Sequence, residues 1–266
     1  MIDIGANLSN KSFKDDLPQV IQRAKDANIQ AIIVTGTSIE SSDAAQRLCN
    51  QYPEYLFATA GIHPHEADNY NQEIEQQLHS LLSQSCVVAA GETGLDYNRN
   101  FSTPANQRQA FEAQIALASQ YKKPLFLHER DAFDDFYSIL SQHKAGYTKA
   151  IVHCFTGSKD TLRAYLDLGL SIGITGWICD KKRGANLREM INYAPLDRLM
   201  IETDAPYLTP HNKSVKEQLS KKHRNEPWTL SYTANTLAEC LAIDTDKLIA
   251  ATSKNAADFF SIDLNK

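Results

Sequence analysis

The sequence predicts an α/β fold of the (β/α)₈, or TIM, barrel class, and three observations support this. Short apolar runs recur along the chain, and amphipathic segments with helical spacing separate them. The runs follow one another at intervals close to the roughly 30 residues of a βαβ unit. No Gly-rich dinucleotide motif follows the first run, where IGANLSN stands instead. This absence disfavours a doubly wound open sheet, which is the second choice.

Eight apolar runs have the length and composition of buried strands. A parallel sheet buried on both faces favours continuous apolar runs of this kind over an alternating pattern. In chain order the predicted strands are Ile2–Asn7, Ala31–Thr35, Leu56–Ile62, Val87–Glu92, Leu125–His128, Ala150–Phe155, Leu170–Thr175 and Leu199–Glu202.

The segments between these runs carry apolar residues at helical spacing, as at Phe111, Ile115 and Ala118. Ser102–Pro104 supplies a hydroxyl cap and a first-turn proline, so Tyr97–Phe101 is predicted to form the preceding loop. Two further helices are expected within Pro227–Phe260, and we expect one domain over residues 1–266. The other predicted helices are Leu17–Ala27, Ser41–Gln51, Ile74–Gln84, Pro104–Gln120, Ala132–Gln142 and Lys159–Leu168.

Composition and charge limit the classes of function. A net charge of −5 disfavours a protein that coats duplex DNA, yet it allows an enzyme that holds one strand end in a locally positive cleft. The five cysteines include no CxxC pair, which disfavours a disulfide framework or a structural zinc module and fits a reducing cytosol. No apolar stretch approaches the roughly 18 residues of a membrane span, and MIDIGANLSN is unlike a signal peptide. We therefore expect a cytoplasmic protein with no membrane partner.

Four potential metal ligands each stand at the end of a different predicted strand: Glu92, His128, His153 and Asp204. One such residue alone is more often a helix cap or a satisfied polar group than a ligand. Four together, on the fourth, fifth, sixth and eighth strands of a barrel, predict one shared site with a position left open for water. Glu202 lies on the same strand face as Asp204 and is expected to orient the ligands from one layer deeper.

The motif GIHPH places His63 and His65 on either side of a proline that stiffens the turn. Both side chains are candidates for metal ligation, or for donating a proton to a phosphate or a leaving group. The alternative is a turn whose histidines face solvent. A functional role is favoured more for His63 than for His65.

Basic and aromatic residues alternate in the predicted loops after the strands. Cations suit phosphates and aromatic faces suit unpaired bases, so the loops predict contact with a single-stranded end. For Lys181–Arg183, a solvated charge run is an equal alternative. The candidate substrate-binding residues are His65, Arg99, Arg130 and Arg224, with Lys181, Lys182, Arg183, Lys221 and Lys222 nearby and Tyr97, Phe101, Phe155, Trp177, Tyr207 and Trp228 interleaved.

Seven stretches resemble the TatD family of metal-dependent nucleases in the family's order: GIHPH, GETGLDYNR, LHERDA, HCFTG, SIGITGW, ETDAPYL and RNEP. The resemblance implies a TIM barrel, a cytoplasmic location and divalent-metal-dependent hydrolysis of phosphodiesters. For the nearest relatives it implies 3′-to-5′ exonuclease action on single-stranded DNA or RNA, linked to repair of oxidative damage. It also matches Glu92, His128, His153 and Asp204 to metal and catalytic positions, and His63 to a substrate-site histidine.

The first strand departs from that pattern. Many family members carry a His-x-His pair there, whereas this chain has Gly5 and Asn7. Glycine offers no ligand and an amide oxygen is a weak one. We therefore expect the site to be more open on that side.

These observations combine into one hypothesis. Glu92, His128 and His153 hold a divalent cation, Mg²⁺ or Mn²⁺ before Zn²⁺, because the ligands mix oxygen and imidazole. Asp204 positions or deprotonates the attacking water or binds a second ion, and His63 contacts the phosphate or the leaving oxygen. The expected enzyme is a monomer acting on 3′ ends of single strands. Two alternatives remain: a deacylase of aminoacylated tRNA or another amide or ester hydrolase on this scaffold, and a non-enzymatic binding module.

Overall fold

The structure is a computed structural model that describes residues 1–263. Within this range the eight predicted strands are all present, with small changes at their ends. The strands are β1 (Ile2–Ala6), β2 (Ala31–Val34), β3 (Leu56–Ala60), β4 (Val87–Asp96), β5 (Leu125–Arg130), β6 (Ala150–Val152), β7 (Ser171–Ile174) and β8 (Leu199–Ile201). The helices are α1 (Leu17–Asp26), α2 (Ile39–Gln51), α3 (Gln72–Leu82), α4 (Pro104–Tyr121), α5 (Phe133–Gln142), α6 (Lys159–Asp167), α7 (Ala185–Met190), α8 (Lys213–Gln218), α9 (Leu230–Leu241) and α10 (Thr245–Phe260).

The strand order identifies the fold class. The eight strands form one sheet in the order β1-β2-β3-β4-β5-β6-β7-β8, and a parallel bridge joins Ala6, at the end of β1, to Ala205, which follows β8. A doubly wound sheet would have a non-sequential order. Sequential parallel strands alternating with helices are those of a (β/α)₈ barrel, as the sequence predicts.

The chain separates into two compact units, which we describe individually. The terminal unit comprises Met1–Val34, Cys154–Arg163 and Ile172–Lys266, and the central unit comprises Thr35–His153 and Ala164–Ser171. A single domain over residues 1–266 therefore stays a prediction.

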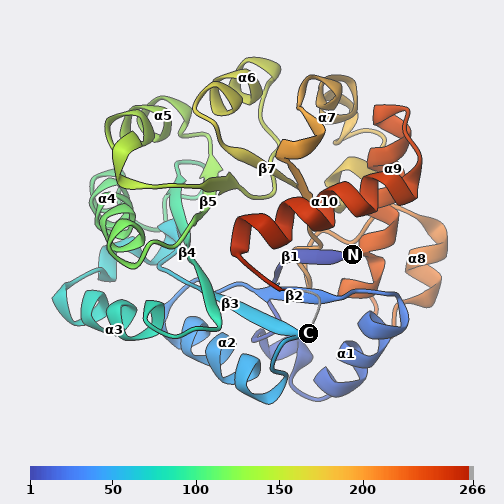
Figure 1. The fold of residues 1–266 in the computed structure, drawn as a ribbon, viewed down its shortest axis with the longest axis horizontal. Helices are drawn as coiled ribbons and strands as arrows, with labels where there is room; N and C mark the ends of the chain where they lie inside the picture. The colour runs from blue at the N-terminus through green and yellow to red at the C-terminus, as the bar shows by residue number, and fades with distance from the viewer. Residues whose placement is uncertain (264–266) are drawn as a thin grey trace. The chain divides into compact units, whose positions relative to one another are not determined.

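In the central unit, helices α2 to α5 lie outside strands β3 to β5 (Figure 1). All residues of β4 are buried, and two glycines let this strand approach β5 closely. Gly91 and Gly94 have φ angles of +135° and +141°, and a Cβ at either position would collide with the carbonyl of Phe126 or His128. The strand therefore brings its polar side chains directly beside those of β5.

The two strands at the centre of this unit end later than the sequence predicts. β4 continues past Glu92 to Asp96, and β5 continues past His128 to Arg130. The extensions pair with each other, with Gly94 opposite His128 and Asp96 opposite Arg130. The apolar runs end earlier than the strands do. Hydrogen bonds between β4 and β5 therefore extend both strands beyond what the sequence pattern indicates. Arg130 accordingly ends a strand, and α5 starts at Phe133 instead of at the predicted Ala132.

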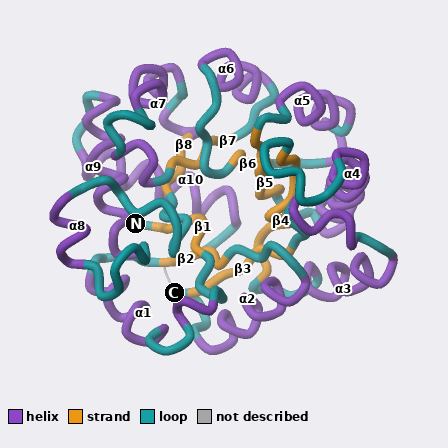
Figure 2. The backbone as a smooth tube through the Cα atoms, turned by 180° about the vertical axis from the view of Figure 1, so that it is seen from behind, coloured by secondary structure: helices purple, strands orange, loops and turns teal. Residues whose placement is uncertain are grey.

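In the terminal unit, α10 covers the beginning of β8. The Asn255 side chain donates hydrogen bonds to the carbonyls of Leu196 and Leu199. Figures 1 and 2 show this helix from opposite sides, with β1 and β2 inside α1 and α8. The two helices predicted within Pro227–Phe260 are confirmed as α9 and α10, whereas the short helices α7 and α8 were not predicted.

A buried ion network joins the start of α1 to the segment before α9 in the terminal unit. Glu226 is fully buried and lies 2.7 Å from both Arg23 Nε and Arg224 Nη2. The two oxygens of Asp16 bind the other side of the Arg224 guanidinium at 2.6 and 2.7 Å. Burial alone would raise the pKa of Glu226, but hydrogen bonds from Arg23, Ser220 and Arg224 outweigh it and lower that pKa.

Replacing Glu226 with alanine should lower the free energy of unfolding by about 3–5 kcal/mol, because Arg23 and the buried Arg224 then share the single carboxylate of Asp16. Since the folded pKa of Glu226 is depressed, its contribution is present above the ordinary carboxyl pKa and is lost as pH falls through the folded value. Urea denaturation at neutral and acidic pH measures both effects. Asp43→Asn is the matched control: it removes an exposed ion pair with Arg47 and should cost no more than about 0.5 kcal/mol. Equal losses of unfolding free energy in Glu226→Ala and Asp43→Asn would contradict the prediction.

Candidate metal centre

The central unit gathers the predicted histidines around Glu92. Glu92 lies within β4, His128 lies on β5, and His153 directly follows β6. His63 follows β3 and caps the short 3₁₀ helix η2 (Pro64–Asn69). The four residues come from four strands that are neighbours in the sheet order, which is why their side chains converge.

Three imidazole rings face a single carboxylate oxygen. Glu92 Oε1 lies 2.8 Å from His153 Nε2, 3.0 Å from His128 Nδ1 and 3.3 Å from His63 Nε2. The ligand atoms of His63, Glu92 and His128 all lie within 4.8 Å of one another. Mixed imidazole and carboxylate donors at this spacing are typical of a divalent metal site.

Burial and neighbouring charges shift the pKa values of the residues in this cluster. Burial alone would raise the pKa of Glu92, but the charges of His153 and His63 outweigh it and hold that pKa well below its usual range. Burial lowers the pKa of His63 even though Glu92 acts in the opposite direction. For His128 the contacts with Asp96 and Glu92 outweigh burial and raise the pKa. The buried Glu92 carboxylate is therefore ionised, and it contacts the imidazole rings of three histidines.

The donor set fits a divalent cation. One carboxylate oxygen accepts hydrogen bonds poorly from three directions at once, whereas a cation accepts a lone pair from each surrounding nitrogen. Among the described residues, buried His128 Nε2 makes no hydrogen bond and lies 3.4 Å from Asp96 Oδ2. That atom faces a carboxylate, as the distal nitrogen of a metal-bound histidine commonly does.

Asp96 is a site residue that the sequence reasoning missed. Its Oδ2 lies 2.8 Å from His65 Nε2, and its Oδ1 accepts hydrogen bonds from the backbone N–H groups of Asn98 and Arg99 at 3.0 and 2.9 Å. Burial alone would raise the pKa of Asp96, but the nearby His128 ring and hydrogen bonds from the Arg99 backbone and His65 outweigh it and lower that pKa. The available signal was its position four residues after Glu92, on the same strand face.

Replacing Asp96 with asparagine should lower metal affinity and turnover by about 10- to 100-fold, because His65 and His128 lose the carboxylate that orients their rings. Calorimetric titration of Mn²⁺ into the purified variant measures the affinity, and circular dichroism checks that the fold is intact. Asp131→Asn is the control, since this exposed carboxylate contacts Asn98 instead of a histidine. Unchanged metal affinity in a folded Asp96→Asn protein would refute a positioning role.

The candidate substrate-binding residues lie in different surroundings. His65 is half-buried, with its ring centroid 4.2 Å from that of His63, and Arg99 and Arg130 are exposed. These three belong to the central unit. Arg224 belongs to the terminal unit, where its guanidinium binds Asp16 and Glu226. The same guanidinium also donates to the Ser12 carbonyl and lies over the Phe13 ring, and a role in substrate binding stays a prediction.

Asp204 also belongs to the terminal unit, where it follows β8. Its N–H donates to the carbonyl of Gly5 at 2.8 Å, and its Oδ1 accepts a hydrogen bond from Asn7 Nδ2 at 3.0 Å. The two residues that depart from the His-x-His pattern thus bind Asp204 directly. Glu202 is fully buried and accepts a hydrogen bond from the Cys154 N–H at 2.5 Å, which fits an orienting residue. The catalytic role of Asp204 stays a prediction.

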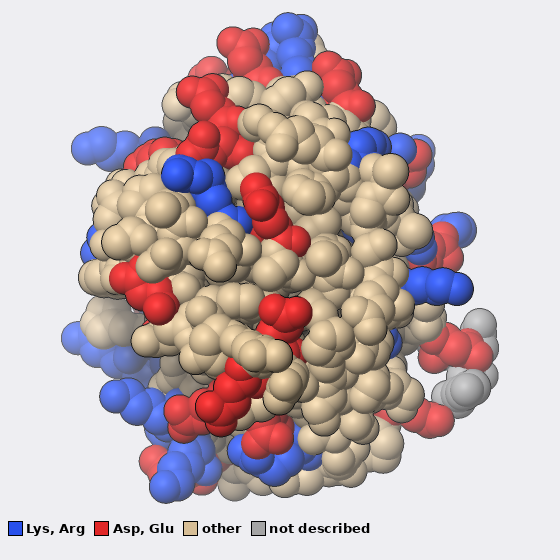
Figure 3. Space-filling model, turned by 90° about the vertical axis from the view of Figure 1, so that its left-hand side faces the viewer, with Lys and Arg blue, Asp and Glu red and all other residues tan. Residues whose placement is uncertain are grey.

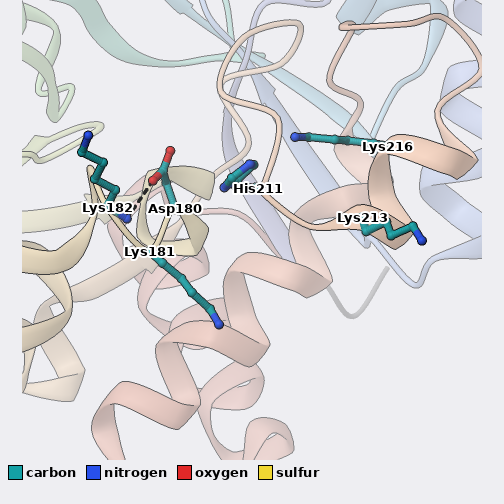
Figure 4. A pocket seen from close by; sticks show the side chains of 6 residues that line it. All are labelled: Asp180, Lys181, Lys182, His211, Lys213 and Lys216. Carbon is teal, nitrogen blue, oxygen red and sulfur yellow. Dashed lines mark hydrogen bonds between the residues drawn. The ribbon is translucent and has the colours of Figure 1, made fainter.

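A lysine-rich pocket of about 460 Å³ opens in the terminal unit. Figure 4 shows Lys216 directed toward His211, whereas the ammonium ends of Lys181 and Lys213 point away from it. Arg183 is not among the lining residues, but its guanidinium pairs with Asp180, which is, and lies 4.7 Å from the centre of the Trp177 ring. The residues lining the pocket are Asp180, Lys181, Lys182, His211, Lys213 and Lys216.

Charge on the outer face of the central unit is consistent with the acidic composition. Figure 3, drawn from the side on which α3 and α4 lie, shows Asp and Glu side chains spread over this face. Among the described residues on it, Lys and Arg form no continuous field. This face therefore lacks the basic surface expected of a protein that coats duplex DNA. None of the helices within residues 1–263 has the length and apolarity that crossing a membrane requires.

Comparison with known proteins gives matches over nearly the whole chain. The family model described as TatD related DNase matches residues 2–261. A 3′-5′ ssDNA/RNA exonuclease TatD from Edwardsiella piscicida is 47% identical over 262 residues, which is 98% of this chain and 100% of the relative. One from Pectobacterium parmentieri (strain WPP163) is 45% identical over the same shares.

Two solved structures have the same fold. The TatD homolog YjjV from Escherichia coli K12 is 28% identical with a TM-score of 0.89, and the match covers 99% of this chain and 98% of that one. A hydrolase of the TatD family from Entamoeba histolytica is 27% identical with a TM-score of 0.86, over 97% of each chain.

Proposed function

Because the chain belongs to the TatD related DNase family, we propose that it is a divalent-metal-dependent 3′-to-5′ exonuclease that hydrolyses single-stranded DNA and RNA. The observation that carries the proposal is the convergence of three imidazole nitrogens on Glu92 Oε1. Relatives that are 42–47% identical over at least 98% of this chain carry the exonuclease name, which supports a phosphoryl over a carbonyl substrate.

Glu92, His128 and His153 are the proposed ligands, and Mg²⁺ or Mn²⁺ is the proposed ion, before Zn²⁺. When bound, the cation supplies Lewis-acid polarisation of the phosphodiester and lowers the pKa of a bound water. His128 would ligate through Nδ1, the atom 3.0 Å from Glu92, because its Nε2 faces Asp96. This arrangement fixes the tautomer of the ring.

His63 is better suited to donate a hydrogen bond than to bind the metal. Its Nδ1 accepts a hydrogen bond from the His65 N–H at 3.1 Å, so in the neutral ring the proton resides on Nε2. Nε2 is the atom that faces Glu92. It therefore serves as a hydrogen-bond donor to the scissile phosphate or to the leaving 3′ oxygen.

Asp204 enters the proposal as the group that positions or deprotonates the attacking water. Its support is the motif ETDAPYL and its hydrogen bond with Asn7, which holds the carboxylate in one orientation. Asp204→Asn should reduce turnover while leaving the affinity for one Mn²⁺ ion at the Glu92 cluster unchanged.

The proposed activity is tested with purified protein, Mg²⁺ and single strands of DNA or RNA labelled at the 5′ end. Stepwise shortening from the 3′ end is the expected result. Intact strands, together with release of the amino acid from charged tRNA, would favour the deacylase alternative. Parallel reactions with Mn²⁺ and Zn²⁺ identify the active ion.

A role in DNA repair after oxidative damage is the broader part of the proposal, and it rests on the nuclease activity proposed above. Deletion of the gene should reduce survival after peroxide treatment. Complementation with the wild type, but not with a Glu92→Ala variant, should restore it. Equal survival of deletion and parent strains would remove this part of the proposal without affecting the nuclease assignment.

A further inference from the structure

The loop between β4 and α4 presents the most exposed large apolar side chain among the described residues. Phe101 is 66% exposed, compared with 54% for Tyr207 and 48% for Tyr193. Its described ring contact is the His65 imidazole, with the centroids 4.8 Å apart and the planes at 79°. Most of the phenyl surface is therefore in water, which costs free energy unless something covers it.

The backbone on both sides of Phe101 is held in place. Before it, Asp96 Oδ1 accepts hydrogen bonds from two successive backbone N–H groups, those of Asn98 and Arg99. After it, Ser102 is buried, and its hydroxyl donates to the His65 carbonyl and accepts from the Asp68 N–H. The ring is thus exposed on a fixed segment of chain, and little conformational entropy would be lost when a ligand packs on it.

A short series of contacts links Phe101 to the metal centre within the central unit. The Phe101 ring packs on His65, whose ring centroid lies 4.2 Å from that of His63, and His63 Nε2 lies 3.3 Å from Glu92 Oε1. The Asp96 side chain that binds His65 also anchors the loop on which Phe101 stands. The same groups therefore position the ligands and the exposed ring.

We propose that the Phe101 ring is the stacking surface for the base of the 3′-terminal nucleotide while its phosphodiester lies at the metal centre. This inference rests on the proposed nuclease function and specifies how that function selects its substrate. A nucleobase offers a flat π-face to an aromatic ring, whatever its sequence. A base inside a duplex is already stacked and paired, so an unpaired terminal base is the form that reaches the ring at least cost.

The test compares two 5′-labelled oligonucleotides that differ at the 3′ end, one with a normal terminal nucleotide and one with an abasic tetrahydrofuran residue. The wild type should cleave the terminal residue with a base at a higher kcat/KM. Phe101→Ala should reduce this base preference by about 5- to 150-fold, mainly through KM, because stacking is a binding contribution. Phe101→Trp should retain the preference, which distinguishes stacking from a general loss of structure.

Tyr193→Ala is the matched control, because this exposed aromatic packs on Lys159 Nζ at 3.5 Å instead of on a histidine of the metal centre. It should keep the wild-type ratio between the two substrates. A Phe101→Ala protein that cleaves both strands with the wild-type ratio would overturn the stacking proposal and leave the nuclease assignment intact. A wild type that cleaves neither strand would instead reject the nuclease function, and the stacking proposal with it.

Discussion

Glu92→Ala should abolish strand cleavage, lowering kcat by at least about 1,000-fold. The Glu92 carboxylate is the common partner of His63, His128 and His153, and no other carboxylate oxygen among the described residues contacts all three. A metal ion contributes several kcal/mol of charge stabilisation to such a reaction, and about 1.4 kcal/mol corresponds to a tenfold change in rate. Loss of the ligand that carries the negative charge should therefore remove most of the catalysis.

Two further variants make this result interpretable. Glu92→Gln keeps the shape of the side chain and should be nearly as inactive, which separates loss of charge from loss of packing. Glu129→Gln is the control, because Glu129 neighbours His128 but its oxygens accept from the Ala132 N–H and the Tyr165 hydroxyl. It should retain most of the activity. Near-normal cleavage rates in a metal-saturated, folded Glu92→Ala protein would contradict the assignment of Glu92 as an essential metal ligand.

Removal of the metal should have an effect of similar size. After dialysis against a chelator, the protein should cleave no single strand, and added Mg²⁺ or Mn²⁺ should restore cleavage. Binding to the folded state alone also stabilises it, by about 2.7 kcal/mol at an ion concentration one hundred times the dissociation constant. The melting temperature of the chelator-treated protein should therefore rise when Mn²⁺ is added.

The thermal shift does not depend on activity, so it tests the ligands directly. Glu92→Gln and His128→Ala should lose the Mn²⁺-induced rise, whereas Glu129→Gln should keep it. A full shift in the His128→Ala protein would place the ion elsewhere. Full cleavage activity in the presence of excess chelator would contradict metal dependence itself.

Several features of the site could be predicted from local sequence. The apolar runs identified all eight strands because burial on both faces of a parallel sheet requires such runs. Side chains at the ends of neighbouring parallel strands converge, so the sequence alone groups Glu92, His128 and His153, which lie together in the structure. The two helices after Pro227 were predicted for the same reason, from their periodicity.

Other features could not be predicted from the sequence, because they depend on contacts between residues that are far apart in the chain. β4 extends to Asp96 because its last residues pair with β5, and that pairing places Asp96, which lies beyond the predicted strand Val87–Glu92, beside His65. The motif GIHPH does not indicate which ring nitrogen of His63 is the donor; in the structure Nδ1 accepts from the His65 N–H, which leaves Nε2, and the role of His63 stays a prediction. The ion pairs of Arg224 with Asp16 and Glu226 could not be predicted from the sequence either, and its predicted contact with substrate stays a prediction.

By itself, the sequence determined the barrel class, the order of its strands and the residue types that gather at their ends. These follow from periodicity and burial, which act over a few residues along the chain. Only the tertiary structure decided which nitrogen of each histidine faces Glu92, how Asp96 orients two rings, and why Phe101 stands exposed beside them. Those properties depend on distances of about 3 to 5 Å between groups far apart in sequence, which no local pattern encodes.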